Sequence, residues 1–158
     1  MPKIELTTEI YSSITICFDL YRSIDLHKIS TVKTNEEAIA GTTSGLINLG
    51  EYVTWKATHF GIKQKLTSKI TAFESPLFFR DEQMKGIFKS FCNDHKFKQV
   101  GEKIIMIDVF EFESPLGIIG QLFNQLVLTN YLRNLLIERN NIIKNYAETD
   151  KWKLVLNS

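Results

Sequence analysis

The sequence predicts an α+β fold in which a strongly curved antiparallel sheet of six to seven strands encloses one long C-terminal helix. Three features support this prediction. A strand pattern is followed by helical spacing, alternating strand patterns then recur between residues 37 and 113, and a proline-free helical pattern comes near the end of the chain. Because strands and helices occupy separate parts of the chain, the helices should gather on one face of an antiparallel sheet.

The N-terminal part of the chain predicts one strand and a helical pair. Lys3 to Ser12 alternates apolar and polar residues, which indicates a half-buried strand. From Ser13 the apolar residues recur at steps of three and four, and a serine can cap the start of a helix. We therefore expect one or two short helices after the first strand, ending near Thr31.

The rest of the sheet is predicted from consecutive alternating segments. Gly61, Gly86, Gly101 and the Ser75–Pro76 pair separate several of them and mark turns. One segment, 62–73, alternates lysine and threonine with apolar residues, so its polar row should face solvent. The strands are expected at Glu37–Thr43, Glu51–Phe60, Ile62–Phe73, Phe78–Met84, Ile87–Lys98 and Glu102–Glu113.

Leu116 to Tyr146 is predicted to be the long helix over which the sheet closes. It would span roughly 45 Å at 1.5 Å per residue. The apolar side of the helix changes near Leu128, so the helix should bend there or meet a different partner through its first turns, such as a lid or a second subunit. The start of the helix is therefore a candidate surface for a homo-oligomer. Residues 1–147 are expected to form a single domain, and 148–158 a loosely held tail.

Composition limits the possible partners. The chain has 158 residues, of which 44% are hydrophobic, as expected for one domain with a substantial core. Its 19 Lys and Arg nearly balance its 18 Asp and Glu, which argues against a nucleic acid or an anionic membrane as partner. No leader pattern and no apolar run long enough to cross a bilayer are present in this sequence, so we expect no integral membrane segment and a cytoplasmic location.

The sequence also gives no signal for a metal or a cofactor. The three histidines are dispersed, and no glycine-rich phosphate loop opens a helix. Cys17 and Cys92 lack the spacing of a metal-binding or redox pair, which favours two buried free thiols over a disulfide. We therefore predict no bound metal and no cofactor.

Six segments, distributed along most of the chain, carry a family resemblance. They are Thr43–Ile47, Gly50–Trp55, His59–Gly61, Phe79–Asp81, His95–Phe97 and Ser114–Gly117. They resemble the SRPBCC superfamily of START, polyketide cyclase and Bet v 1-like domains, and in particular its small uncharacterised bacterial members. This resemblance implies a helix-grip fold around a deep apolar cavity, and hence binding of a lipid, sterol, polyketide, isoprenoid quinone or plant-hormone-like molecule.

The penultimate strand departs from the pattern of the similar bacterial sequences. Those sequences usually place an aromatic residue, two histidines and an aromatic residue at alternating positions. This chain instead has Phe91, Asn93, His95 and Phe97, and so keeps only one histidine. Any role that needs both histidines is therefore not expected to transfer.

One polar pair is expected inside the sheet. If the last two strands pair about Val100–Gly101, His95 lies opposite Asp108 on an otherwise apolar face. The two side chains could simply satisfy each other, or they could anchor the polar end of a ligand. They are also the only candidates for catalysis, with His95 as a general base and Asp108 orienting its ring, as a cyclase or dehydratase acting on a polyketide-like substrate would need.

The function favoured by the sequence is non-covalent binding of a small, mostly apolar molecule with one polar end. Eleven phenylalanines are either ordinary core or the lining of a partly unfilled cavity. A cyclase-like enzyme and a protein-interaction module remain the alternatives. The residues predicted to contact the ligand are Trp55, His59, Gln64, Leu66, Phe79, Asp81, Phe91, Asn93, His95, Asp108, Phe110 and Gln125.

Overall fold

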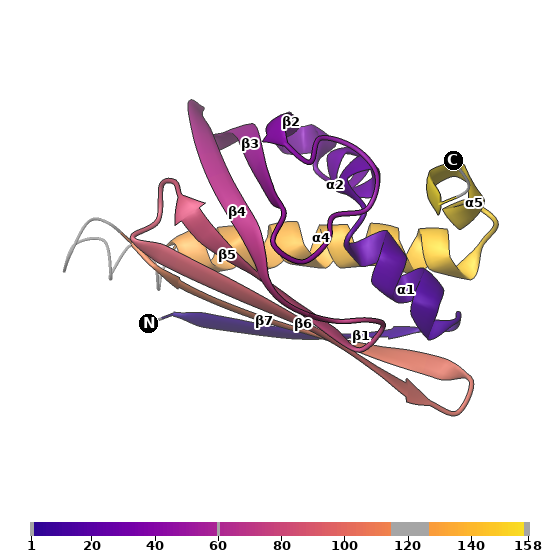
Figure 1. Cartoon of the computed structure of the whole chain (residues 1–158). Coiled ribbons are helices and arrows are strands. Elements are labelled where there is room, and N and C mark those ends of the chain that lie inside the picture. The colour runs from indigo at the N-terminus through magenta and orange to yellow at the C-terminus, as the bar shows by residue number, and fades with distance from the viewer. Residues whose placement is uncertain (1, 60, 115–126, 157–158) are drawn as a thin grey trace.

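The computed structural model describes residues 2–59, 61–114 and 127–156 and shows a curved sheet with helices on its inner side (Figure 1). The sheet has seven strands in the order β1-β7-β6-β5-β4-β3-β2, and every neighbouring pair is antiparallel. The predicted α+β class is confirmed, with the sheet at the upper end of the predicted strand number.

The elements follow one another in the predicted order. The strands are β1 (Lys3–Ile10), β2 (Glu37–Gly41), β3 (Tyr52–His59), β4 (Ile62–Glu74), β5 (Phe78–Lys85), β6 (Ser90–Val100) and β7 (Lys103–Glu113). The helices are α1 (Ile14–Tyr21), α2 (Ile24–Ser30), the short 3-10 helix η1 (Val32–Thr34), α4 (Thr129–Glu148) and α5 (Trp152–Leu156).

Serine side chains start both short helices. The hydroxyl of Ser13 accepts a hydrogen bond from the backbone N–H of Ile16 at 3.2 Å, and that of Ser23 accepts one from Leu26 at 3.1 Å. Each hydroxyl satisfies an N–H group that has no partner within its helix. The second cap divides the predicted helical pair into two helices that turn back over the sheet.

The register between β6 and β7 agrees with the predicted one. Phe91 lies opposite Phe112, Asn93 opposite Phe110, His95 opposite Asp108 and Phe97 opposite Met106. All eight side chains are buried, because one face of both strands points toward the helices.

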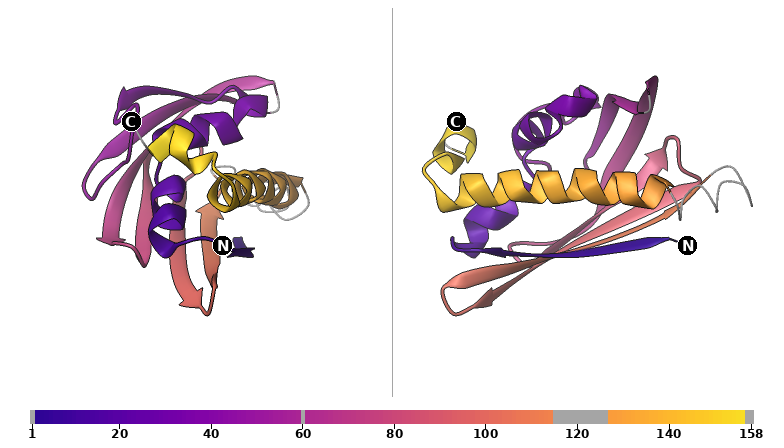
Figure 2. Two further views of the ribbon diagram at one scale, coloured as in Figure 1. Left: turned by 90° about the vertical axis from the view of Figure 1, so that its right-hand side faces the viewer. Right: turned by 180° about the vertical axis from the view of Figure 1, so that it is seen from behind.

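Irregular pairing helps to curve the sheet around α4. The register shifts between Ala38 and Ala40 in β2, and twice between β4 and β5. Such shifts bend a strand and increase its twist. In the left view of Figure 2, α4 is seen nearly end-on and the sheet forms an open arc, with α1 and α2 inside the arc. The two edges of the arc, β1 and β2, contact α4 and α2, respectively.

Two apolar clusters fill the interior. The larger is centred on Phe18 of α1, whose ring meets those of Phe73, Phe79 and Phe97 edge-on at centroid distances of 5.4, 5.5 and 5.4 Å. The smaller one lies at the opposite end of the sheet and consists of Ile4, Phe91, Phe110, Phe112 and Leu136.

The end of the chain differs from the predicted loose tail. Residues 152–156 form helix α5, and Trp152, Val155 and Leu156 pack against the larger core cluster beside α1. The three residues lie at i, i+3 and i+4, so one face of this single turn is apolar and is covered by α1. By contrast, the predicted start of the long helix, 116–126, lies outside the described residues.

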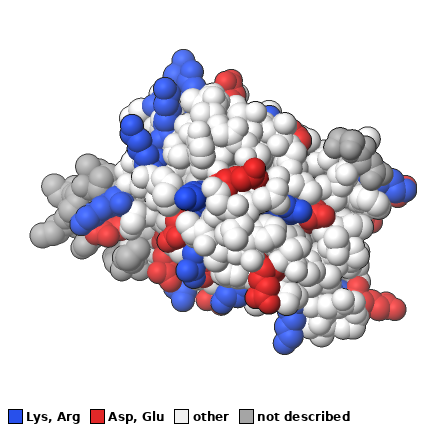
Figure 3. Space-filling view, in the orientation of Figure 1, with Lys and Arg blue, Asp and Glu red and all other residues white. Residues whose placement is uncertain are grey.

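The surface agrees with the predicted polar row on β4, where Lys63, Lys65 and Lys69 are exposed. In Figure 3, basic and acidic side chains intermix over most of the visible face, with a group of basic ones at the upper left. Cys17 is a buried free thiol as predicted, whereas Cys92 is free but only half-buried. Within the described ranges, no helix is both long and apolar enough to span a bilayer.

Replacing Phe18 by alanine should destabilise the protein by about 3–5 kcal/mol, because the cavity left among three aromatic rings cannot close. Urea unfolding measures this difference directly. The control is Leu154→Ala on α5, whose side chain is 81% exposed and whose loss should change the free energy of unfolding by less than about 0.5 kcal/mol. Equal effects of the two changes would contradict the assignment of Phe18 to the centre of the core.

Candidate functional site

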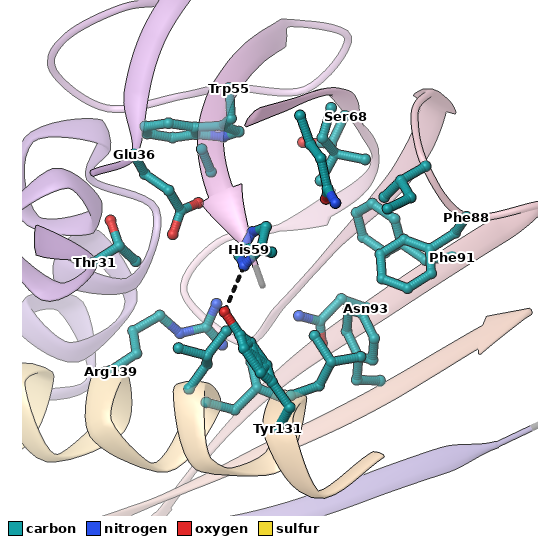
Figure 4. A pocket seen from close by; sticks show the side chains of 18 of the residues that line it. Thr31, Glu36, Trp55, His59, Ser68, Phe88, Phe91, Asn93, Tyr131 and Arg139 are labelled. Atoms are coloured by element: carbon teal, nitrogen blue, oxygen red, sulfur yellow. Dashed lines mark hydrogen bonds between the residues drawn. The ribbon is translucent and has the colours of Figure 1, made fainter. Parts of the chain in front are cut away.

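A cavity of about 390 Å³ lies between the concave face of the sheet and α4 (Figure 4). The strands β3 to β7 form its walls, α2 and the segment before β2 form one side, and α4 covers it. Its lining consists of His27, Thr31, Glu36, Trp55, Ala57, His59, Gln64, Leu66, Ser68, Asp81, Ile87, Phe88, Phe91, Asn93, Phe110, Ser114, Leu128, Tyr131, Leu132, Leu135, Leu136 and Arg139.

One end of the cavity is apolar. Phe91 and Phe110 stack with a centroid distance of 5.4 Å, and the ring of Phe88 meets that of Phe91 at 6.1 Å. Leu132 and Leu136 of α4 lie against this aromatic group. This end therefore presents ring faces and methyl groups, which favour an apolar guest.

The side of the cavity formed by α2 and β3 carries two hydrogen-bonded pairs. Nε2 of His27 lies 3.1 Å from Oε1 of Glu36. Nδ1 of His59 lies 2.8 Å from the hydroxyl oxygen of Tyr131, as the dashed line in Figure 4 shows. Burial opposes ionisation of Glu36, but the charge and hydrogen bond of His27 and a hydrogen bond from Thr34 outweigh it and lower the pKa of Glu36. Burial lowers the pKa of His59, which favours its neutral form.

A chain of ionisable side chains lies beneath the cavity and crosses three strands. The ring of His95 on β6 is hydrogen-bonded at both nitrogens, with Nδ1 2.8 Å from Oδ1 of Asp108 on β7 and Nε2 2.7 Å from Oδ2 of Asp81 on β5. His95 and Asp108 are almost completely buried, whereas Asp81 reaches the cavity. We refer to Asp81, His95 and Asp108 as the buried triad.

Side chains from α1 and α4 complete the partners of Asp108. The hydroxyl of Tyr21 donates to Oδ1 of Asp108, and Nδ2 of Asn140 donates to Oδ2 at 2.8 Å. Nη2 of Arg139 donates to the Tyr21 hydroxyl oxygen and lies 3.8 Å from Asp108 Oδ1, and the guanidinium stacks over the Tyr21 ring at 4.6 Å. The triad thereby connects both helices to the sheet.

The charges of the buried triad stabilise one another. Burial acts to lower the pKa of His95, but hydrogen bonds to Asp108 and Asp81 and their negative charges outweigh it and raise that pKa above its ordinary value. Burial acts to raise the pKa of Asp108. The hydrogen bond and charge of His95 and the charge of Arg139 outweigh burial and lower that pKa. Burial raises the pKa of Tyr21 well above its ordinary value, so Tyr21 stays neutral and donates its proton.

Most residues predicted to contact a ligand line the cavity. They are Trp55, His59, Gln64, Leu66, Asp81, Phe91, Asn93 and Phe110. His95, Asp108 and Phe79 depart from the prediction, because the structure places them behind the cavity wall: the first two are covered by their own partners, and Phe79 packs against Phe18 and His95. Gln125 lies outside the described residues.

Arg139 and Asn140 are site residues that were not predicted from the sequence. Both occur within the apolar stripe of α4, where Leu135, Leu136 and Ile143 are their neighbours at helical spacing. A charged and an amide side chain at such positions are a signal for a buried polar site. Glu36 had no comparable signal, because it comes from a polar segment that resembles an ordinary loop.

The arrangement does not favour His95 as a general base. Both of its ring nitrogens already have a carboxylate partner, and its side chain does not reach the cavity. A base must have a nitrogen within hydrogen-bond reach of the substrate proton. Among the residues that the structure describes, no three His, Cys, Asp or Glu side chains group closely enough to hold a metal ion.

Comparison with solved structures identifies close likenesses in fold. They include protein TTHA0849 from Thermus thermophilus (17% identity, TM-score 0.70, covering 90% of this chain and 97% of that chain) and major latex-like protein 151 from Panax ginseng (18%, 0.67, 94% and 98%). Ara h 8.0201 is a third (10%, 0.62, 90% and 97%). No protein-family model and no curated protein sequence matches the chain.

These likenesses confirm the fold that the sequence resemblance implies. The chain has a helix-grip fold, in which a curved antiparallel sheet surrounds a long helix, and it shares this fold with the solved structures named above. The fold and the cavity together define a class of protein in which a curved sheet and a long helix enclose an internal space.

The buried triad predicts a specific pH dependence of stability. Since the folded-state pKa of His95 is raised, the stability that this group contributes is complete below its unfolded pKa of about 6.5 and is lost as pH rises through the folded pKa. The free energy of unfolding, measured with urea from pH 5.5 to 9, should therefore fall more steeply in the wild type than in His95→Gln.

His59→Gln is the control for this measurement. The folded-state pKa of His59 is lowered, so its contribution has the opposite sign and is lost as pH falls through that pKa. In this variant, the free energy of unfolding should still decline toward alkaline pH as it does in the wild type. Parallel pH profiles for the wild type and His95→Gln would contradict a protonated His95 in the folded protein.

Proposed function

We propose that the protein is a non-covalent receptor or carrier for a small, mostly apolar molecule with one polar end. The observation that carries this proposal is the cavity of about 390 Å³ with an aromatic and aliphatic end and polar groups on its other sides. Its volume and its combination of apolar lining with a few polar groups are typical of small-molecule sites.

Such a cavity has a large energetic cost, which argues that it has a function. At ~24 cal/mol per Å³, an unfilled apolar space of this volume would destabilise a fold by roughly 9 kcal/mol. Net stabilities of domains are only ~5–15 kcal/mol, so that cost is comparable with the whole stability of a typical domain. A ligand that fills the aromatic end would remove part of this destabilisation.

The cavity suits a ligand of moderate size. Water occupies about 30 Å³ per molecule in the liquid, so the cavity has room for roughly a dozen non-hydrogen atoms. Such a molecule could place its apolar part beside Phe88 and Phe91 and still reach Asn93 or Arg139 with its other end (Figure 4). Binding in this arrangement needs no catalytic group.

Leu132→Trp should abolish binding, because the larger side chain occupies the apolar end of the cavity. Binding is measured by isothermal titration calorimetry with 2-methylnaphthalene, an uncharged apolar probe whose size matches the cavity. The wild type should bind it saturably at a single site, and the variant should lose at least ten-fold in affinity.

Asn134→Trp is the matched control, since residue 134 is exposed on the same helix and does not line the cavity. It should bind the probe like the wild type. Thermal unfolding of all three proteins shows that each is folded. Unchanged probe binding in a folded Leu132→Trp variant would place binding elsewhere and refute the proposal.

A further inference from the structure

The ionisable groups that line the cavity already have polar partners within the protein. Asp81 meets His95 at 2.7 Å, Glu36 meets His27 at 3.1 Å, and Arg139 lies 3.8 Å from Asp108. A charged ligand would therefore meet acidic and basic groups that already have partners. It would also lose its hydration on entering the cavity, which is costly for an ion without a dedicated partner.

Hydrogen-bonding capacity, in contrast, is left unused at the cavity wall. Asn93 is 3% exposed and lines the cavity, yet its Oδ1 has no hydrogen-bond partner. The buried Nε of Arg139 likewise has none, and these are the two such side-chain atoms among the described residues. In Figure 4 both side chains point toward the same space, from β6 and from α4.

A buried amide without a partner destabilises a fold, so its presence on a cavity wall indicates a group that completes it. The Oδ1 atom needs a donor. A carboxylate or a ketone offers only acceptors, whereas a hydroxyl group donates to Oδ1 and can accept from an amide or guanidinium N–H. A hydroxyl therefore complements this wall whichever way the amide is turned.

From these observations we infer that the polar end of the ligand is an uncharged hydroxyl group, held by Asn93 with Arg139 beside it. This inference rests on the proposed function and names its ligand class: apolar alcohols and phenols in preference to the corresponding carboxylates. Asn93 acts as the specificity-determining residue.

Three rigid probes of similar size test the inference by isothermal titration calorimetry at pH 7: 2-naphthol, 2-naphthoate and 2-methylnaphthalene. The wild type should bind 2-naphthol roughly five- to ten-fold more tightly than 2-methylnaphthalene, as expected for one additional buried hydrogen bond, and 2-naphthoate most weakly. In Asn93→Leu, the affinity for 2-naphthol should fall to that for 2-methylnaphthalene, whose own affinity should not decrease.

Thermal unfolding provides a second readout for the same variant. Asn93→Leu removes an unpaired buried amide and should leave the melting temperature unchanged or raise it. Asn134→Leu, the same substitution at an exposed position of α4, should alter neither affinity nor selectivity. A marked loss of stability in Asn93→Leu would show that the amide has structural partners and would overturn the inference.

The binding outcomes separate this inference from the proposed function. Equal affinities for 2-naphthol and 2-methylnaphthalene would refute the hydroxyl site and leave a receptor for apolar molecules. Tightest binding of 2-naphthoate would replace it with an anion site at Arg139. Failure of all three probes to bind would refute the proposed function and the inference together.

Discussion

The ion pairs within the buried triad are the interaction on which both the closure of the fold and the chemistry of the cavity depend. Asp81, His95 and Asp108 come from three adjacent strands, and a buried charge is tolerated only with a partner of opposite charge. The helices contribute the remaining partners, Tyr21, Arg139 and Asn140. Satisfying Asp108 therefore fixes where α1 and α4 lie on the sheet.

The same network divides the interior into a filled part and an unfilled part. On one side of it, Phe18 and its aromatic neighbours pack into a continuous core. On the other side, α4 bridges the sheet over the cavity, with Arg139 and Asp81 at the boundary. The network thus anchors α4 without filling the space beneath it. The polar wall of the cavity is therefore the exposed edge of this same network.

Much of the fold was predictable because it depends on local patterns. Alternation and turn residues identified the strands, and one register assumption correctly paired His95 with Asp108. The partners of that pair could not be predicted in the same way. Tyr21 and Arg139 are separated by 118 residues, so their contact depends on how α1 and α4 pack and not on any local pattern.

The candidate site was predictable only in part, for a related reason. Alternation along a strand shows which residues face inward, and it correctly placed Gln64, Leu66 and Asn93 on the inner face. It does not show how far the helix lies above them. His95 and Phe79 also face inward but are covered by packed side chains. Asn93 and Asp81, two positions away on the same strands, line the cavity instead.

Native mass spectrometry of the protein purified from its own host tests the central claim, that the cavity holds a small molecule, most directly. The wild type should carry a molecule in a one-to-one ratio that denaturation releases, and Leu132→Trp purified in the same way should carry none. The mass of the chain alone for both proteins, or the same adduct on both, would contradict that claim.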